Sequence, residues 1–365
     1  MRGVDVIEGI QNYIVNWVKV KKGENVLLLA DSLADHLVVE MTAAVARAQG
    51  AHVVVSWIEY NPVQTMGGGK IIDAALTGTD KMLRFTFATS HDAGTVKACR
   101  EYGLRIYGVC NPTQEFFASE AARFPVELML EIARESVQRA RAGRKIHITD
   151  KKGTDLTAEG RPENWSCEIR PKGFKGDYRT WDYDTELPGN YPMTFPGSVT
   201  GLIPPENGNG VAYFDAFSSI GVCEEPMKFT FKDNRFVSVE GGKEADQFNA
   251  TYSGIPNINA VVEIMWGLHP KTRNILDQKP FPNEAERRAG NLHIGVGNRP
   301  LMSMKPWKEK APKQYHLDGF ILKPTITIND EVLIDNGRLT VLDDPRIREI
   351  AKKYGDPDKL LAYQA

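Results

Sequence analysis

Short apolar runs alternate with helix-like segments over residues 1–142. The apolar runs, each long enough for a buried strand, are residues 25–31, 52–58, 81–87 and 105–110. The segments between them, with apolar residues at helical spacing, are 33–50, 69–76, 92–103 and 113–121. Strand–helix alternation of this kind indicates a parallel sheet with helices on both of its faces. We therefore expect an α/β, Rossmann-like domain over residues 1–144, although no Gly-x-Gly-x-x-Gly or phosphate-loop motif follows its first strand.

The pattern changes near residue 145. Residues 145–160 predict two strands around a turn, and residues 228–242 predict a hairpin. Proline and glycine become frequent between residues 171 and 210. We expect a second, α+β domain over residues 145–365, with an antiparallel sheet that carries the functional site.

Composition narrows the class of protein. The 365 residues suffice for two domains, and the net charge of −2 with no long basic run does not indicate a nucleic-acid partner. The four cysteines form no Cys-x-x-Cys pair, which is typical of a reduced, cytoplasmic compartment. We expect no membrane partner, because the sequence has neither a signal peptide nor a run of 18 apolar residues.

His316 and Asp318 stand two positions apart at the head of an apolar run. On a strand, residues i and i+2 point to the same face, so this imidazole and this carboxylate would meet at one place. That place would hold a metal ion, a substrate proton or only a buried hydrogen bond.

Glu263 and His293 are further candidates for the same site. Glu263 lies within an apolar run, where a carboxylate is costly unless it is paired or bound to a metal. His293 precedes a Gly-x-Gly segment, which lets backbone approach closely. The wide spacing of these residues predicts separate strands that converge, and imidazole with carboxylate suits Zn²⁺, Fe²⁺ or Mn²⁺ better than Ca²⁺ or Mg²⁺. The alternative is a buried His–Asp hydrogen bond with an unrelated glutamate.

His91 directly follows the third predicted strand. Open α/β sheets present ligand-binding groups at the carboxyl ends of their strands, so His91 is a candidate catalytic residue. The alternative is a polar residue at the start of a helix. Arg84, on the same predicted strand, is a candidate for binding a substrate carboxylate or hydroxyl group, and a surface ion pair is its alternative.

Four segments carry a resemblance to a known family. Residues 85–91, 266–270, 290–298 and 315–321 resemble the metallo-aminopeptidase T family and, more closely, its offshoot that opens the ring of 2,5-dihydroxypyridine with O₂. The likeness covers most of the chain. Ser198 stands where the aminopeptidases have a ligating glutamate, and Pro300 stands where they have a tyrosine. The resemblance therefore implies a single-metal site.

The resemblance also implies roles for individual residues. The implied metal ligands are Glu263, His293, His316 and Asp318. In the ring-opening relatives Fe²⁺ is held by two histidines and an aspartate, and Glu263 falls where the first of those histidines stands. His91 matches a histidine near their substrate, and we expect it to act as general base. The expected substrate contacts are Trp266, His269, Ser198 and Arg84.

Three functions remain open at this point. The first is a mononuclear Fe(II) dioxygenase that opens a hydroxylated, nitrogen-containing aromatic ring, with a small-molecule substrate and O₂ as partners. The second is a single-metal hydrolase of an amide or peptide bond, with Zn²⁺ or Mn²⁺ and with Glu263 as general base. The third is a binding protein that has kept the fold and lost the chemistry. A three-ligand site would favour oxygenation, and a four-ligand site would favour hydrolysis. The resemblance also implies a homodimer or larger homo-oligomer.

Overall fold

The computed structural model divides into two compact units. It describes residues 3–60, 69–86, 93–161, 165–167, 193–197, 199–279, 281–298 and 315–363. One unit comprises Met1–Met129 and Trp181–Gly197, and the other comprises Leu130–Thr180 and Ser198–Ala365. The division falls within helix α7 (Val126–Arg141), earlier in the chain than the expected boundary at 144.

The first unit is built on a parallel sheet whose five described strands have the order β2-β1-β3-β4-β8. The strands are β1 (Asn25–Asp31), β2 (His52–Ile58), β3 (Lys81–Phe85), β4 (Arg105–Val109) and β8 (Met193–Phe195). The four apolar runs of the sequence form β1 to β4, which confirms the predicted parallel sheet. The fifth strand comes from beyond the expected domain boundary, and its three residues are too few to show a periodicity.

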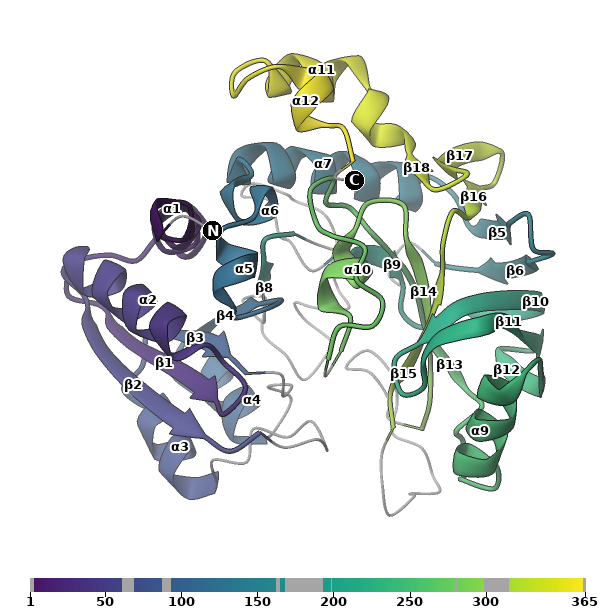
Figure 1. Ribbon diagram of the computed structural model, residues 1–365, viewed down its shortest axis with the longest axis horizontal. Helices are drawn as coiled ribbons and strands as arrows, with labels where there is room; N and C mark the ends of the chain where they lie inside the picture. The colour runs from purple at the N-terminus through teal and green to yellow at the C-terminus, as the bar shows by residue number, and fades with distance from the viewer. Residues whose placement is uncertain are drawn as a thin grey trace. The chain divides into compact units, whose positions relative to one another are not determined.

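Helices accompany the strands of the first unit (Figure 1). They are α1 (Gly3–Gln11), the π-helix η1 (Asn12–Val18), α2 (His36–Ala48), α3 (Gly69–Leu76), α4 (Ala93–Glu101), α5 (Gln114–Phe117) and α6 (Glu120–Arg123). Tyr13 ties η1 to the sheet, because its hydroxyl donates to the carbonyl oxygen of Tyr107 at 2.8 Å. Its ring centre lies 5.9 Å from that of Phe85 and 5.1 Å from that of Phe195, at distances typical of packed aromatic pairs.

The second unit is built on a sheet of thirteen described strands, all of whose neighbours pair in antiparallel fashion. The strands are β5 (Lys145–Thr149), β6 (Asp155–Glu159), β7 (Trp165–Cys167), β9 (Val199–Leu202), β10 (Glu206–Phe217), β11 (Gly221–Lys232), β12 (Arg235–Glu240), β13 (Val261–Gly267), β14 (Leu292–Val296), β15 (Leu317–Ile321), β16 (Thr325–Ile328), β17 (Glu331–Asp335) and β18 (Arg338–Leu339). The predicted pair β5–β6 and the predicted hairpin β11–β12 are both confirmed.

Helices of the second unit lie between and after these strands. They are α9 (Lys243–Tyr252), α10 (Asn283–Arg287), the 3-10 helix η3 (Thr340–Asp343), α11 (Pro345–Ala351) and α12 (Pro357–Leu360). Pro345 and Pro357 begin α11 and α12, positions where the missing N–H costs no helical hydrogen bond. Asp344 and Asp356 cap these helices by accepting backbone N–H groups.

Strands β13, β14 and β15 are neighbours in the sheet and are buried along their whole length (Figure 1). One face of β15 packs on an aromatic core, because a side chain at Gly319 would lie 2.6 Å from both the Phe214 and the Phe217 ring. Since strand residues alternate in direction, Asp318 points to the other face. Polar side chains of these three strands therefore gather on the face away from Phe214 and Phe217.

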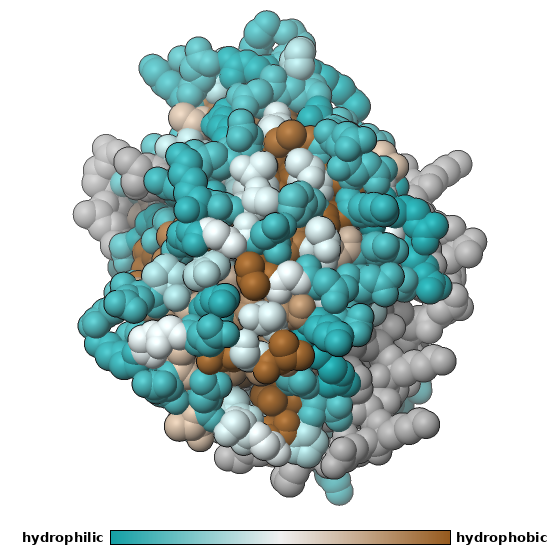
Figure 2. Space-filling model, turned by 90° about the vertical axis from the view of Figure 1, so that its right-hand side faces the viewer, coloured by the Kyte–Doolittle hydropathy of each residue, from teal (hydrophilic) through white to brown (hydrophobic). Residues whose placement is uncertain are grey.

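Hydrophilic residues dominate the face of the molecule seen in Figure 2, and small apolar areas lie among them. Exposed apolar side chains of the second unit include Val222, Val237 and Val332. Among the described helices, we find none with the length and hydropathy that a membrane span requires.

Candidate metal centre

Glu263, Gly295 and Asp318 form one row across three adjacent strands. Glu263 on β13 is paired with Gly295 on β14, and Gly295 is paired with Asp318 on β15. Directly paired residues project to the same face of a sheet, so both carboxylates stand over the glycine. A Cβ atom at Gly295 would lie 2.6 Å from Cγ of Glu263 and 3.0 Å from Cε1 of His316. The missing side chain thus leaves room in which the functional groups meet.

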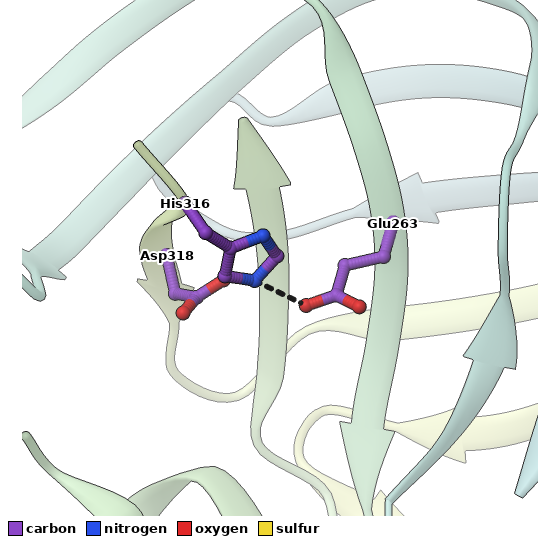
Figure 3. A group of neighbouring side chains, drawn as sticks. All are labelled: Glu263, His316 and Asp318. Carbon is purple, nitrogen blue, oxygen red and sulfur yellow. Dashed lines mark hydrogen bonds and ion pairs between the residues drawn. The ribbon is translucent and has the colours of Figure 1, made fainter. Parts of the chain in front are cut away.

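His316 lies between the two carboxylates (Figure 3). Its Nε2 is 2.9 Å from Oε1 of Glu263 and 3.1 Å from Oδ1 of Asp318. The three side chains each offer one ligand atom, and all three atoms lie within 4.8 Å of one another. His316 and Asp318 thus converge on one point, as predicted. Glu263, from a strand that is distant in the sequence, reaches the same point.

The donor set fits a divalent cation. Two carboxylates and one imidazole are ligands that suit Fe²⁺, Mn²⁺ and Zn²⁺. Glu263 is 7% exposed and Asp318 is 3% exposed, and such burial of two carboxylates is costly without compensating positive charge. Oδ1 of Asp318 is buried, and its 3.1 Å contact with Nε2 of His316 lacks full hydrogen-bond geometry; Nδ1 of His316 is buried without a hydrogen-bond partner among the described residues. A cation at this position would satisfy the aspartate oxygen.

The charges of the cluster shift the pKa values of its members. Burial alone lowers the pKa of His316, but the carboxylates of Asp318 and Glu263 outweigh it and raise that pKa to about 10. Burial raises the pKa of Glu263, but the two neighbouring imidazoles outweigh it and hold the pKa well below the ordinary value of a glutamate. In the metal-free protein, protons on the imidazoles therefore supply the positive charge that a cation would bring.

His293 adjoins the cluster without joining the group of three. Its Nε2 lies 3.5 Å from Oε1 of Glu263 and 3.8 Å from Oε1 of Glu286. Burial lowers the pKa of His293, but the contact with Glu263 and the charges of Glu286 and Asp318 raise it to about 9. Sequence reasoning did not single out Glu286. It lies on α10, seven residues before His293, and no periodicity or motif marks it.

Trp266 lies on the opposite face of β13 from Glu263. Trp266 is paired with Leu292, whereas the neighbouring residue Met265 is paired with His293. Because successive strand residues point to opposite faces, Met265 shares the face of Glu263 and Trp266 does not. Its ring centre is 5.9 Å from that of Trp165, and it is 1% exposed. The assignment of Trp266 as a substrate contact stays a prediction that this geometry does not support.

His269 is buried between backbone groups. It is fully buried, and its Nδ1 accepts the backbone N–H of Lys271 at 3.1 Å. Burial, with the charge of Lys271, lowers its pKa to about 3 and keeps the imidazole neutral. These contacts hold the turn after β13, and a role for His269 in substrate binding stays a prediction.

Of the remaining candidates, Arg84 is the one that belongs to the described residues. Arg84 is half-buried on β3 of the first unit. Its guanidinium lies close to Gly108 on β4, since a Cβ atom added there would be 3.0 Å from it. His91, Ser198 and Pro300 lie outside the described residues. The expected roles of Arg84, His91 and Ser198 stay predictions.

Comparisons with known proteins agree on one relationship. A family model described as 2,5-dihydroxypyridine 5,6-dioxygenase matches residues 10–341. Among solved structures, the chain is similar to 2,5-dihydroxypyridine dioxygenase from Pseudomonas putida KT2440, at 16% identity over 93% of this chain and 98% of that chain, with a TM-score of 0.71. It is also similar to AmpT from Thermus thermophilus, at 14% identity over 92% of this chain and 99% of that chain, with a TM-score of 0.57. No curated protein sequence matches the chain.

At these identities the two structural similarities concern the fold. They extend over both units, so the expected α/β and α+β organisation is shared with both proteins.

Proposed function

We propose that this chain, which belongs to the 2,5-dihydroxypyridine 5,6-dioxygenase family, is a mononuclear Fe²⁺ dioxygenase that opens a hydroxylated, nitrogen-containing aromatic ring. The observation that carries the proposal is the buried cluster of Glu263, His316 and Asp318, whose ligand atoms all lie within 4.8 Å of one another. When bound there, Fe²⁺ would supply the redox chemistry that a reaction with O₂ requires and that side chains lack. A three-ligand site leaves positions for O₂ and substrate oxygens.

The side chains of the cluster have separable roles in this proposal. Glu263 and Asp318 would balance the charge of the cation, and His316 would add the imidazole ligand. Gly295 keeps the space between them free of side-chain atoms. Burial of β13, β14 and β15 keeps bulk water away from the ligands. His91 is proposed as the base that accepts the proton of a substrate hydroxyl, since a neutral imidazole with the ordinary histidine pKa of about 6.5 suits that step.

A second function is favoured by one observation. Glu263 places a carboxylate beside His316 and Asp318, where it could take a proton from a water molecule on Zn²⁺ or Mn²⁺ in hydrolysis of an amide or peptide bond. In that case Glu263 would serve as general base rather than as ligand. AmpT shares the fold, and this likeness supports no more than the scaffold.

One experiment separates the two functions. The protein is purified without oxygen, its metals are measured, and O₂ consumption is followed with 2,5-dihydroxypyridine and related hydroxypyridines. We expect iron, O₂ uptake and loss of both in Asp318→Asn and His316→Gln. His147→Gln is the matched control, because His147 lies half-exposed on β5 and pairs with Asp155. Hydrolysis of leucine amide by a protein without iron and without O₂ uptake would establish the second function instead.

A further inference from the structure

The imidazole of His293 lies between two carboxylates that come from different elements. It is 1% exposed, and its Nε2 faces Oε1 of Glu263 at 3.5 Å and Oε1 of Glu286 at 3.8 Å. Among the described residues neither ring nitrogen has a partner at full hydrogen-bond geometry. Ionised carboxylates only accept hydrogen bonds, so the arrangement is attractive when Nε2 carries the hydrogen. A nitrogen that carries a hydrogen has no lone pair to offer a cation.

The carboxylate of Glu286 is held in place by Arg287. Its Oε2 is paired with Nη1 of Arg287 at 2.5 Å, and the same Nη1 donates to the carbonyl oxygen of Asn283 at 3.0 Å. The Arg287 side chain is 5% exposed, so this ion pair is well shielded from water. The pairing of Oε2 leaves Oε1 as the oxygen that faces His293. The buried guanidinium of Arg287 thus orients the carboxylate of Glu286 toward the imidazole of His293.

The short helix that carries Glu286 is anchored independently. Glu284, on the same helix, forms a bidentate pair with Arg273 at 2.8 Å and 2.5 Å and is fully buried. The side chain of Asn291 donates to the carbonyl oxygen of Ala285 at 2.9 Å, which joins α10 to the start of β14. The distance between Glu286 and His293 is therefore fixed by contacts on both sides.

We propose that Glu286 is a positioning residue that keeps His293 as an Nε2–H donor toward Glu263, so that His293 supports a cation ligand and is not itself the fourth ligand. The inference rests on the proposed function, because it presumes a cation held by Glu263, His316 and Asp318. Carboxylate ligands of metal ions are commonly oriented by hydrogen bonds from outer residues. With His293 in this role, the cation keeps three protein ligands and its remaining positions stay open to substrate and O₂.

Mn²⁺ binding to the metal-free full chain tests the inference, with titration calorimetry as the readout. The side-chain amide nitrogen of glutamine reaches the place of Nε2 and donates, whereas leucine fills the space and cannot donate. We expect His293→Gln to bind Mn²⁺ within about 3-fold of the wild type and His293→Leu to bind it ~10-fold more weakly. Equal losses in the two variants would assign His293 as a ligand and overturn the inference.

A double-mutant cycle tests whether Glu286 acts through His293. We expect Glu286→Gln to weaken Mn²⁺ binding ~10-fold in the wild-type background and to have no further effect in His293→Leu. If Glu286 contributed only its charge to the cation, the loss would be the same in both backgrounds, and the inference would be wrong. His147→Gln, which alters a half-exposed histidine of β5, is the control and is expected to leave the dissociation constant for Mn²⁺ unchanged.

Two further measurements complete the design. The melting temperature without metal shows whether Glu286→Gln is folded. If that variant does not fold, Glu286→Asp, whose side chain is shorter by one carbon, is used in its place. The aspartate variant is likewise expected to weaken Mn²⁺ binding, and unchanged binding would contradict the inference. Failure of the proposed function itself gives a different pattern, because Asp318→Asn and His316→Gln would then bind Mn²⁺ as the wild type does, or the wild type would not bind it.

Discussion

His316 and Glu263 meet over a glycine. Nε2 of His316 lies 2.9 Å from Oε1 of Glu263, although β14 separates β13 from the strand that follows His316. The residue of β14 between them is Gly295, which is paired with both Glu263 and Asp318. A side chain at this position would occupy the space in which the imidazole and the carboxylate approach each other.

Gly295→Ala is expected to weaken cation binding at the cluster by at least ~10-fold and to destabilise the protein by about 1–3 kcal/mol, because the added methyl group overpacks a closed site. Its Cβ atom would lie 2.6 Å from Cγ of Glu263, so the carboxylate must move. Mn²⁺ titration and thermal unfolding measure the two effects.

Gly78→Ala is the control for this substitution. A Cβ atom there meets nothing within 4 Å, and we expect no change in Mn²⁺ affinity. An unchanged affinity in Gly295→Ala as well would show that the cation does not sit over β14.

The melting temperature of the metal-free protein is expected to depend on pH through this cluster. The pKa values of His293 and His316 are raised to about 9 and about 10 in the folded state. Their contribution to stability is therefore fully present below the ordinary histidine pKa of about 6.5 and is lost as the pH rises through about 9 to 10. The pKa of Glu263 is lowered, so its contribution is present above the ordinary glutamate pKa and is lost at acid pH.

Glu263→Gln isolates this effect, because it removes the carboxylate that both imidazoles face. In the presence of a chelator, we expect the variant to melt below the wild type at pH 6, and we expect the difference to shrink at pH 10. A difference that does not change between these two pH values would mean that the imidazoles do not exchange protons in this range.

Asp150 is expected to stabilise the turn between β5 and β6. Its Oδ1 accepts the backbone N–H groups of Lys152, Gly153 and Thr154 at 2.8, 3.1 and 3.0 Å. Burial raises the pKa of Asp150, but Lys152 and the backbone N–H groups outweigh it and hold the pKa below its ordinary value. The contribution is thus present above the ordinary aspartate pKa of about 3.9 and lost as the pH falls through the folded pKa.

Asp150→Asn should therefore cost about 1.5–3 kcal/mol near neutral pH, the usual range for hydrogen bonds to a charged group. Denaturant unfolding of the variant and the wild type at pH 7 and pH 3 measures it, and the two should approach each other at the lower pH. Equal stabilities at pH 7 would show that neutral asparagine holds the turn equally well.

The pair of Arg273 and Glu284 is expected to contribute to folding. Glu284 is fully buried, and its two oxygens accept from one guanidinium. Removing one partner of a buried ion pair costs about 3–5 kcal/mol, so Glu284→Gln should lower the melting temperature by several degrees. Arg273→Lys keeps the charge but loses the bidentate geometry, and it should also destabilise.

Local patterns in the sequence determined much of the framework. The apolar runs 25–31 and 52–58 are strands β1 and β2 to the residue, and 69–76 is helix α3 to the residue. Buried strands and amphipathic helices impose their own periodicities on the chain, so such elements are visible without a structure. Strand β8 was not visible, because its three residues gain their place only by pairing with β4.

The sequence by itself also determined which residue types were candidates for a cation site. A buried carboxylate at Glu263 and an alternating His316–Asp318 pair are local signals, since burial and strand alternation act on neighbouring residues. Only the tertiary structure decided that these three meet over Gly295, that His293 stands beside Glu286, and that Trp266 points to the opposite face. The physical reason is that register across β13, β14 and β15 arises from strand pairing between distant segments, and a shift of one residue would turn every one of these side chains to the other face.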